Sequence, residues 1–114
     1  MYSQGEILLI PLPFTDLSSQ KKRPVLVLSK KNYNDAADDV IVAAITSNID
    51  TKPYAVFVSN NDMVRGILKV TSCVRVDKIY TLAQNIVIKR FGKVKPEIVD
   101  AVKEKLLSML DESI

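Results

Sequence analysis

The chain has 114 residues, of which 47% are hydrophobic and 25% are charged, and its formal net charge is +3. These values exclude a disordered chain and fit one globular domain, which we expect to span residues 1–114. No run approaches the roughly 20 apolar residues that cross a bilayer, and the first residues lack the pattern of a signal peptide, so we expect a cytoplasmic protein with no membrane partner.

The first two predicted strands are strongly apolar. Residues 6–11, "EILLIP", predict a strand that ends near Pro11 and Pro13, because proline cannot donate to a ladder. Residues 23–29, "RPVLVLS", carry Val and Leu at successive positions, which is typical of a strand buried on both faces. The polar residues 15–22 between them predict an exposed loop, and we expect a mobile flap beside Arg23.

Two further apolar runs follow in the middle of the chain. Residues 40–47 and 54–59, "VIVAAITS" and "YAVFVS", predict a third and a fourth strand. Residues 30–39 are interpreted as an acidic turn region, and residues 60–66, "NNDMVRG", contain the Asn, Asp and Gly of a turn. Short strands joined by such loops, with no helix between them, indicate a small barrel or sandwich.

Residues 67–79, "ILKVTSCVRVDKI", predict a fifth strand with one apolar and one polar face. The expected core face carries Leu68, Val70, Val74 and Val76. The opposite face carries Lys69, Thr71, Cys73, Arg75 and Asp77. Antiparallel sheets commonly expose one face to water, so the alternation alone does not distinguish a site from an ordinary surface.

The end of the chain predicts one more strand and a helix. Residues 85–92 form the expected sixth strand, which Gly92 ends. Residues 95–113 predict a helix because Pro96 suits its first position and Glu97 complements the positive N-terminal dipole. Apolar residues recur there every four positions, at Ile98, Val102, Leu106 and Leu110. The expected fold class is therefore mainly β with a C-terminal helix, an α+β arrangement.

Positive charge gathers in the first 96 residues. Residues 21–31 hold five cations and no anion, and residues 89–95 hold four cations and no anion. Residues 97–114 hold five acids against two lysines, so the rest of the chain carries +6 within a total of +3. A field of this sign favours a negatively charged partner.

The residue types present restrict the possible chemistry. The chain has no histidine, so Ser-His, Cys-His and His-His pairs are excluded and a zinc site would lack its usual ligands. The single cysteine, Cys73, cannot form an internal disulfide and is interpreted as a small filler rather than a nucleophile. We expect no cofactor and no metal.

Three ordered segments carry a resemblance to a known family. Residues 5–29, "GEILLIPLPFTDLSSQKKRPVLVLS", residues 42–49, "VAAITSNI", and residues 74–82, "VRVDKIYTL", resemble the signature segments of the MazF/PemK toxin endoribonucleases, the mRNA interferases. The resemblance implies a small SH3-like barrel of the MazF/CcdB type. It also implies a homodimer, an antitoxin partner expected to carry an acidic segment, and cleavage of single-stranded RNA without a metal ion.

The same resemblance implies which residues form the site. The arginine that opens the second strand, the threonine that ends the third, and the arginine and aspartate of the "VR-x-D" segment correspond to Arg23, Thr46, Arg75 and Asp77. Some members have a histidine in the first loop, which this chain lacks. We further expect RNA contacts from Phe14, Lys21, Lys22, Ser47, Lys69 and Thr71.

Metal-free cleavage uses the 2′-hydroxyl of the RNA as nucleophile and yields a 2′,3′-cyclic phosphate. A guanidinium suits the phosphate because its planar fork of donors matches two oxygens, so Arg23 and Arg75 are the expected clamps. Two nearby cations would keep Asp77 ionised but also lower its basicity, and an arginine is a poor proton acceptor. The general base is therefore open between Asp77 and Arg23.

Other polar and aromatic residues allow different readings. Phe14, Tyr54 and Tyr80 are candidates for base stacking, whereas Phe57 is expected in the core. The alternatives to a ribonuclease are a non-catalytic RNA-binding module and a CcdB-like gyrase inhibitor on the same fold. The second is disfavoured because the chain has no tryptophan and ends in "LDESI".

Overall fold

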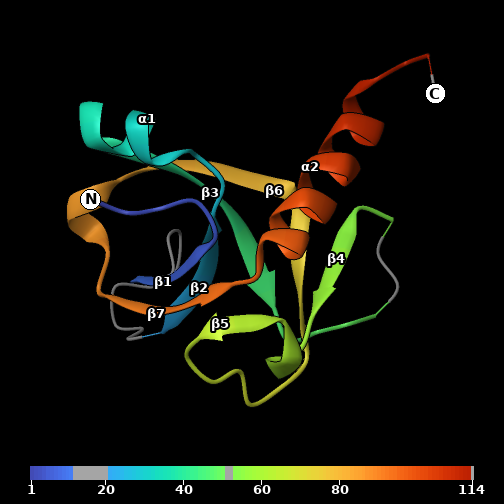
Figure 1. The fold of residues 1–114 in the computed structure, drawn as a ribbon, viewed down its shortest axis with the longest axis horizontal. Coiled ribbons are helices and arrows are strands. Elements are labelled where there is room, and N and C mark those ends of the chain that lie inside the picture. Colours follow the sequence, from blue (N-terminus) through green and yellow to red (C-terminus); the bar gives the residue numbers. More distant parts are fainter. Residues whose placement is uncertain (12–20, 51–52, 114) are drawn as a thin grey trace.

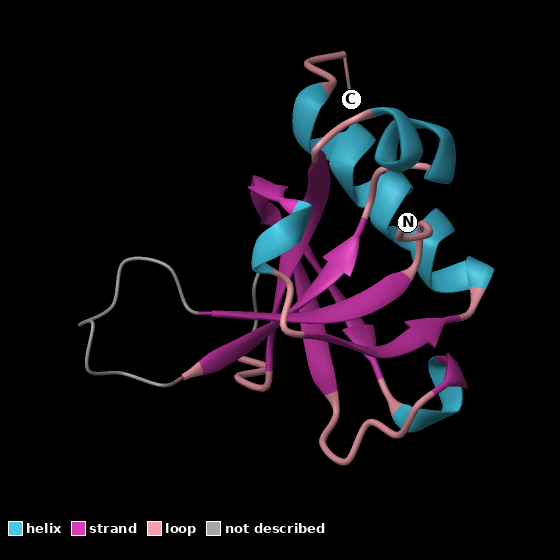
Figure 2. Ribbon diagram, turned by 90° about the vertical axis from the view of Figure 1, so that its left-hand side faces the viewer, coloured by secondary structure: helices cyan, strands magenta, loops and turns pink. Residues whose placement is uncertain are grey.

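A computed structural model describes residues 1–11, 21–50 and 53–113. One antiparallel sheet of seven strands curls around the molecule in the order β4-β6-β3-β2-β1-β7-β5, with helix α2 against one side (Figures 1 and 2). The strands are β1 (Glu6–Pro11), β2 (Lys22–Val27), β3 (Asp39–Thr46), β4 (Ala55–Val58), β5 (Met63–Arg65), β6 (Ser72–Ala83) and β7 (Lys89–Val94). The helices are α1 (Lys31–Ala36) and α2 (Pro96–Leu110), with single 3₁₀ turns at η1 (Asn60–Asp62) and η2 (Gln84–Ile86).

The central strands β1, β2 and β3 bury both of their faces. One face joins a core cluster with the first turns of α2 and includes Ile7, Leu26 and Ala43. The other face forms a second cluster around Leu8 and Val25, which Tyr2, Tyr80, Leu82 and Val87 cover in part. The successive apolar residues of the first two predicted strands therefore have a structural cause, and the predicted fold class of a mainly β domain with a C-terminal helix is confirmed.

Helix α2 packs on the sheet through its first turns. Pro96 occupies its start and Glu97 lies in the first turn, as predicted. Ile98, Val99 and Val102 are buried against the core cluster. The last turn extends beyond the sheet (Figure 1), and Leu110 remains 67% exposed there. The four-residue apolar repeat is therefore longer than the part of the helix that packs on the sheet.

Two segments contain elements that were not predicted. The segment interpreted as an acidic turn contains α1, whose buried Asn34 side chain donates to the Tyr2 and Ser29 carbonyls. The segment interpreted as a turn at residues 60–66 contains η1 and strand β5, which pairs with β7. These elements depend on contacts with residues that are distant in the sequence, so the local residue pattern does not predict them.

The predicted fifth strand begins too early. Strand β6 starts at Ser72, and residues 67–71 precede it, so Lys69 and Thr71 do not share a strand face with Arg75. Val70, assigned to the core, is 58% exposed. The reason is local: Gly66 has a φ of +82°, and the Leu68 amide donates to the Asn60 side chain, and both hold this segment outside the strand. The predicted sixth strand is likewise shifted, since β7 covers Lys89–Val94.

Within the part of the chain that the structure describes, no helix is long and apolar enough to cross a membrane.

Candidate active site

Strand pairing brings Arg23 and Thr46 to the same end of the sheet. In the β2–β3 ladder Val25 opposes Ala44, and the same register continued by two residues places Arg23 opposite Thr46. A pocket of about 230 Å³ opens at this point. Its lining residues are Lys22, Arg23, Pro24, Ile45, Thr46, Ser47 and Ser72. Four of the predicted site residues therefore share one pocket.

Arg75 lies one row of residues away from Thr46. On the β3–β6 ladder Thr46 opposes Cys73 and Ala44 opposes Arg75. Opposed residues point to the same side of a sheet, so Thr46 and Arg75 are diagonal neighbours on one face, a spacing of about 7–8 Å in ordinary ladders. Arg75 does not line the pocket itself. It stands beside the pocket, within reach of a ligand that extends past Thr46.

Arg75 and Asp77 form a two-pronged ion pair. The Arg75 Nε donates to Asp77 Oδ1 at 2.9 Å, and Arg75 Nη2 donates to Asp77 Oδ2 at 2.7 Å. The hydrogen bonds from Arg75 hold the pKa of Asp77 below its usual value, and the same bonds raise the pKa of Arg75. Both carboxylate oxygens accept from one guanidinium, which makes Asp77 a weak proton acceptor and fixes the orientation of Arg75.

The position of Asp77 follows from an irregularity in strand pairing. The β3–β6 register shifts between Ala43, which opposes Ile79, and Ala44, which opposes Arg75. Residues 76–78 are therefore extra on β6 and have no partner on β3. A bulge of this kind re-aims side chains at the edge of a site. No sequence signal marked it, since the alternation of residues 67–79 looks regular.

The hydroxyl of Thr46 is oriented by the turn that follows β3. Its Oγ1 accepts a hydrogen bond from the Asn48 amide at 3.1 Å. The Asn48 side chain in turn accepts from the Asp50 amide at 3.2 Å, and the Cys73 thiol lies 3.7 Å from the Asn48 carbonyl. The hydroxyl proton of Thr46 thus remains available to an oxygen of a bound ligand. Cys73 is fully buried, as expected for a filler.

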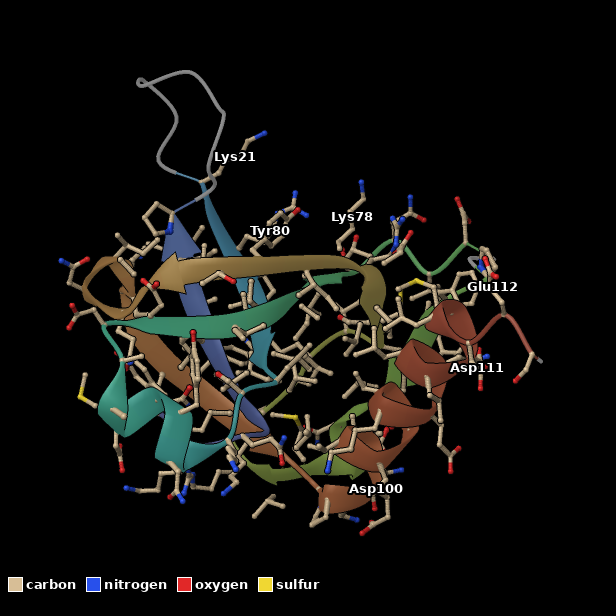
Figure 3. The ribbon with its side chains drawn as sticks, turned by 90° about the horizontal axis from the view of Figure 1, so that it is seen from above. Lys21, Lys78, Tyr80, Asp100, Asp111 and Glu112 are labelled. Carbon is tan, nitrogen blue, oxygen red and sulfur yellow. The ribbon has the colours of Figure 1, made fainter. Side chains whose placement is uncertain are left out.

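The remaining predicted RNA contacts have different positions. Phe14 lies outside the described residues, as does most of the predicted flap. Lys21 lies on the same side of the molecule as Tyr80 and Lys78 (Figure 3). Lys69 and Thr71 are exposed in the segment before β6. Ser72 lines the pocket but was missed, because an unbroken strand over residues 67–79 would place it on the core face.

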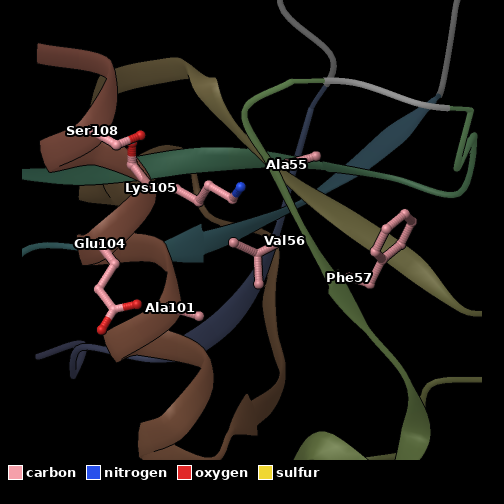
Figure 4. A pocket seen from close by; sticks show the side chains of 7 residues that line it. All are labelled: Ala55, Val56, Phe57, Ala101, Glu104, Lys105 and Ser108. Atoms are coloured by element: carbon pink, nitrogen blue, oxygen red, sulfur yellow. The ribbon is translucent and has the colours of Figure 1, made fainter. Parts of the chain in front are cut away.

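A larger pocket lies elsewhere, between β4 and α2. It has a volume of about 570 Å³ and is lined by Ala55, Val56, Phe57, Ala101, Glu104, Lys105 and Ser108 (Figure 4). None of the predicted catalytic residues reaches it. Phe57, which we expected in the core, is 56% exposed here because β4 is the last strand of the sheet.

Three acidic residues near the end of the chain lie away from the candidate site. Asp100, Asp111 and Glu112 belong to α2 and the residues after it, on a different side from Lys21, Tyr80 and Lys78 (Figure 3). Among the residues that the structure describes, no group of three or more Asp, Glu, Cys or His side chains is placed to hold a metal ion. The candidate site therefore offers cations and hydroxyls to a ligand.

These features agree with the family model that matches the sequence. The model for PemK-like, MazF-like toxins of type II toxin-antitoxin systems covers residues 3–110. The chain belongs to this family. The resemblance of the three sequence segments is thereby confirmed, and the chain is a toxin of the type II class by family. No curated protein sequence matches this toxin.

Solved structures share the fold of the toxin. The Mycobacterium tuberculosis toxin MazF-mt6 is 25% identical, with a TM-score of 0.72 over 90% of this chain and 93% of that chain. An endoribonuclease in complex with its cognate antitoxin from a mycobacterial species is 22% identical, with a TM-score of 0.78 over 96% and 95%. A MazE–MazF complex from Deinococcus radiodurans is 23% identical, with a TM-score of 0.78 over 96% and 95%. The expected MazF-type fold is confirmed.

Proposed function

We propose that this toxin is an endoribonuclease that cleaves single-stranded RNA at short sequences, without a metal ion, through attack of the RNA 2′-hydroxyl on the adjacent phosphate. The products are a 2′,3′-cyclic phosphate and a free 5′-hydroxyl. The observation that supports this most strongly is the shared pocket of Arg23 and Thr46, with Arg75 one row away on the same sheet face.

Arg23 acts as the clamp on the reacting phosphate. Its strand is held between β1 and β3, so the backbone that carries the guanidinium is rigid. A planar fork of donors matches two phosphate oxygens and stabilises the charge that develops on them in the transition state. Thr46, in the same pocket, donates its hydroxyl proton to a phosphate oxygen.

Arg75 is the second clamp, and Asp77 positions it. Asp77 accepts from both Nε and Nη2 of Arg75, which leaves the other guanidinium donors for the ligand. A carboxylate whose pKa is lowered by this pair is a poor general base. Of the two groups considered as the general base, Asp77 is therefore assigned to orienting Arg75. As the bond from O2′ to phosphorus forms, the proton of the 2′-hydroxyl passes to water. As the bond from phosphorus to the 5′-oxygen breaks, Arg23 in the pocket donates a proton to that oxygen and regains one from water.

The decisive experiment is an RNA cleavage assay in the presence of EDTA. The wild type is expected to cut single-stranded RNA at a short motif and to leave 2′,3′-cyclic ends, whereas Arg23→Ala is expected to leave the same RNA intact. Intact RNA across a broad panel of sequences with the wild type would contradict the proposal. Salt-dependent binding without cleavage would instead identify a non-catalytic RNA-binding module.

We also propose an antitoxin partner and a homodimer. An antitoxin with an acidic segment would compete with RNA for the cationic first 96 residues, and two of the similar solved structures contain an antitoxin or MazE. Co-purification with the cognate antitoxin, and loss of RNA cleavage in that complex, test the first part. Light scattering after size-exclusion chromatography tests the second.

A further inference from the structure

A second cationic pocket lies where β5 pairs with β7. It has a volume of about 460 Å³ and is lined by Arg65, Gly66, Arg90, Phe91 and Gly92. Strand β5 ends the sheet on the side opposite to β4. The proposed cleavage mechanism gives this pocket no role.

One buried carboxylate holds both arginines of this pocket. The Glu6 side chain is 3% exposed, Arg90 Nε donates to its Oε2 at 2.9 Å, and Arg65 Nη2 lies 3.8 Å from the same oxygen. The Ser3 amide donates to the other carboxylate oxygen at 2.7 Å. A buried charge requires such partners, so Glu6 anchors the two guanidiniums side by side. Two cations on one anion leave a net positive charge at the pocket.

Most of the arginine donors are still available. A guanidinium has five N–H groups. Arg90 uses its Nε on Glu6 and one Nη2 proton on the Met1 carbonyl at 3.2 Å, and its guanidinium lies 4.6 Å from the centre of the Tyr2 ring. Among the described residues, Arg65 has only the 3.8 Å contact, which is too long for a hydrogen bond, and its side chain is 61% exposed.

The backbone around the pocket keeps the arginines together. Gly66 has a φ of +82°, and a Cβ on it would lie 2.6 Å from the Phe91 carbonyl oxygen. A Cβ on Gly92 would lie 2.5 Å from the Arg65 carbonyl oxygen. Only glycine permits this close approach of β5 and β7, which fixes Arg65 next to Arg90.

A short segment joins this pocket to the candidate active site. Gly66 lines the arginine pocket and Ser72 lines the pocket of Arg23 and Thr46. The six residue steps between them reach at most about 20 Å when fully extended. Lys69, which is exposed, lies on this segment. A single RNA strand that occupies the active-site pocket can therefore also reach the arginine pocket.

We infer that the pocket of Arg65 and Arg90 binds a backbone phosphate of the RNA strand outside the cleaved site. This inference rests on the proposed function. Charge-assisted donors on a rigid sheet edge suit a phosphodiester, and a contact to phosphate adds affinity without sequence preference. The pocket raises the affinity of the toxin for long RNA and has no effect on an RNA that covers only the active site.

The test compares two lengths of 2′-O-methyl RNA, which cannot be cleaved because it lacks the 2′-hydroxyl. Fluorescent oligonucleotides of about 3 and about 20 nucleotides bracket the roughly 4 to 16 nucleotides that a small domain covers. Arg65→Gln is expected to bind the longer RNA about tenfold more weakly, with a salt slope lower by about 0.7, and the shorter RNA unchanged. Glu6 retains Arg90 in this variant, so the fold is preserved, which thermal unfolding would verify.

Lys103→Gln is the matched control, because it removes an exposed cation from α2 on another part of the surface. It is expected to bind both RNAs as the wild type does. Equal weakening of both lengths by Arg65→Gln, or no weakening, would overturn the inference while RNA binding by the wild type persists. If Arg65→Gln weakens the binding of an acidic peptide but of neither RNA, the pocket binds a protein partner, and this result would also overturn the inference. If the wild type binds neither RNA, the proposed function itself fails.

Discussion

Two pockets of the toxin differ in size and in chemistry. The pocket between β4 and α2 is the larger, at about 570 Å³, yet its lining offers one anion, one cation, one hydroxyl and otherwise apolar side chains. The pocket of Arg23 and Thr46 is about 230 Å³, but adjacent strands place two cations and hydroxyl groups on it. Transition-state stabilisation depends on converging donors, so the smaller pocket is the candidate site and volume is a poor guide here.

Removal of a cation is expected to affect RNA cleavage far more at the pocket of Arg23 and Thr46 than at the larger pocket. Arg23→Ala is expected to lower kcat/KM for RNA cleavage by about 100-fold to 1000-fold, as for removal of a donor that stabilises a developing charge. Lys105→Ala, which removes a cation from the larger groove, is expected to leave kcat/KM within about twofold of the wild type. Steady-state cleavage kinetics measure both. Equal effects of the two variants would refute the assignment of the site.

Removal of the Thr46 hydroxyl should have the next largest effect. Thr46→Ala is expected to lower kcat by about 10-fold to 100-fold, because the hydroxyl is oriented toward its task by the Asn48 amide. Thr46→Ser keeps the oxygen and its proton and should restore most of the rate. Single-turnover cleavage separates this effect from product release. Failure of the serine variant to restore activity would show that the methyl group, and with it packing, is what matters.

Asp77 distinguishes a positioning residue from a general base. Asp77→Asn is expected to lower kcat/KM by about tenfold, because Arg75 loses its two-pronged partner. The acidic limb of the pH–rate profile should stay in place, since the carboxylate does not accept the reacting proton. If that limb disappears in Asp77→Asn, the carboxylate is the base and the role given to it here is wrong.

The smallest expected effect is on stability at low pH. The folded pKa of Asp77 lies below its unfolded value, so its pair with Arg75 adds stability above the unfolded pKa of about 3.8 and loses it as pH falls through the lower folded pKa. The pair is partly exposed, so its contribution is small. Chemical denaturation should therefore show wild type and Asp77→Asn differing slightly at neutral pH and converging in acid. A gap that widens in acid would contradict this sign.

Some strands were predicted correctly and others were not, and the difference has a physical cause. Strands β1 and β2 are apolar on both faces because two core clusters cover them, and such runs are visible in the sequence. Strand β5 is three residues long and partly exposed, and only its pairing with β7 makes it a strand. Residues 67–71 alternate like a strand, but Gly66 and the Asn60 side chain hold them outside β6.

The sequence by itself determined the mainly β architecture, the C-terminal helix and the excess of positive charge in the first 96 residues. Its resemblance to the MazF/PemK family implied Arg23, Thr46, Arg75 and Asp77 as candidates. Periodicity and composition are local properties, so they can be read without coordinates. The tertiary structure alone decided that Arg23 and Thr46 share a pocket, that Asp77 is committed to Arg75, and that Glu6 gathers Arg65 and Arg90. Each of these depends on strand register, a bulge or the burial of one carboxylate, which arise only when distant segments pack together.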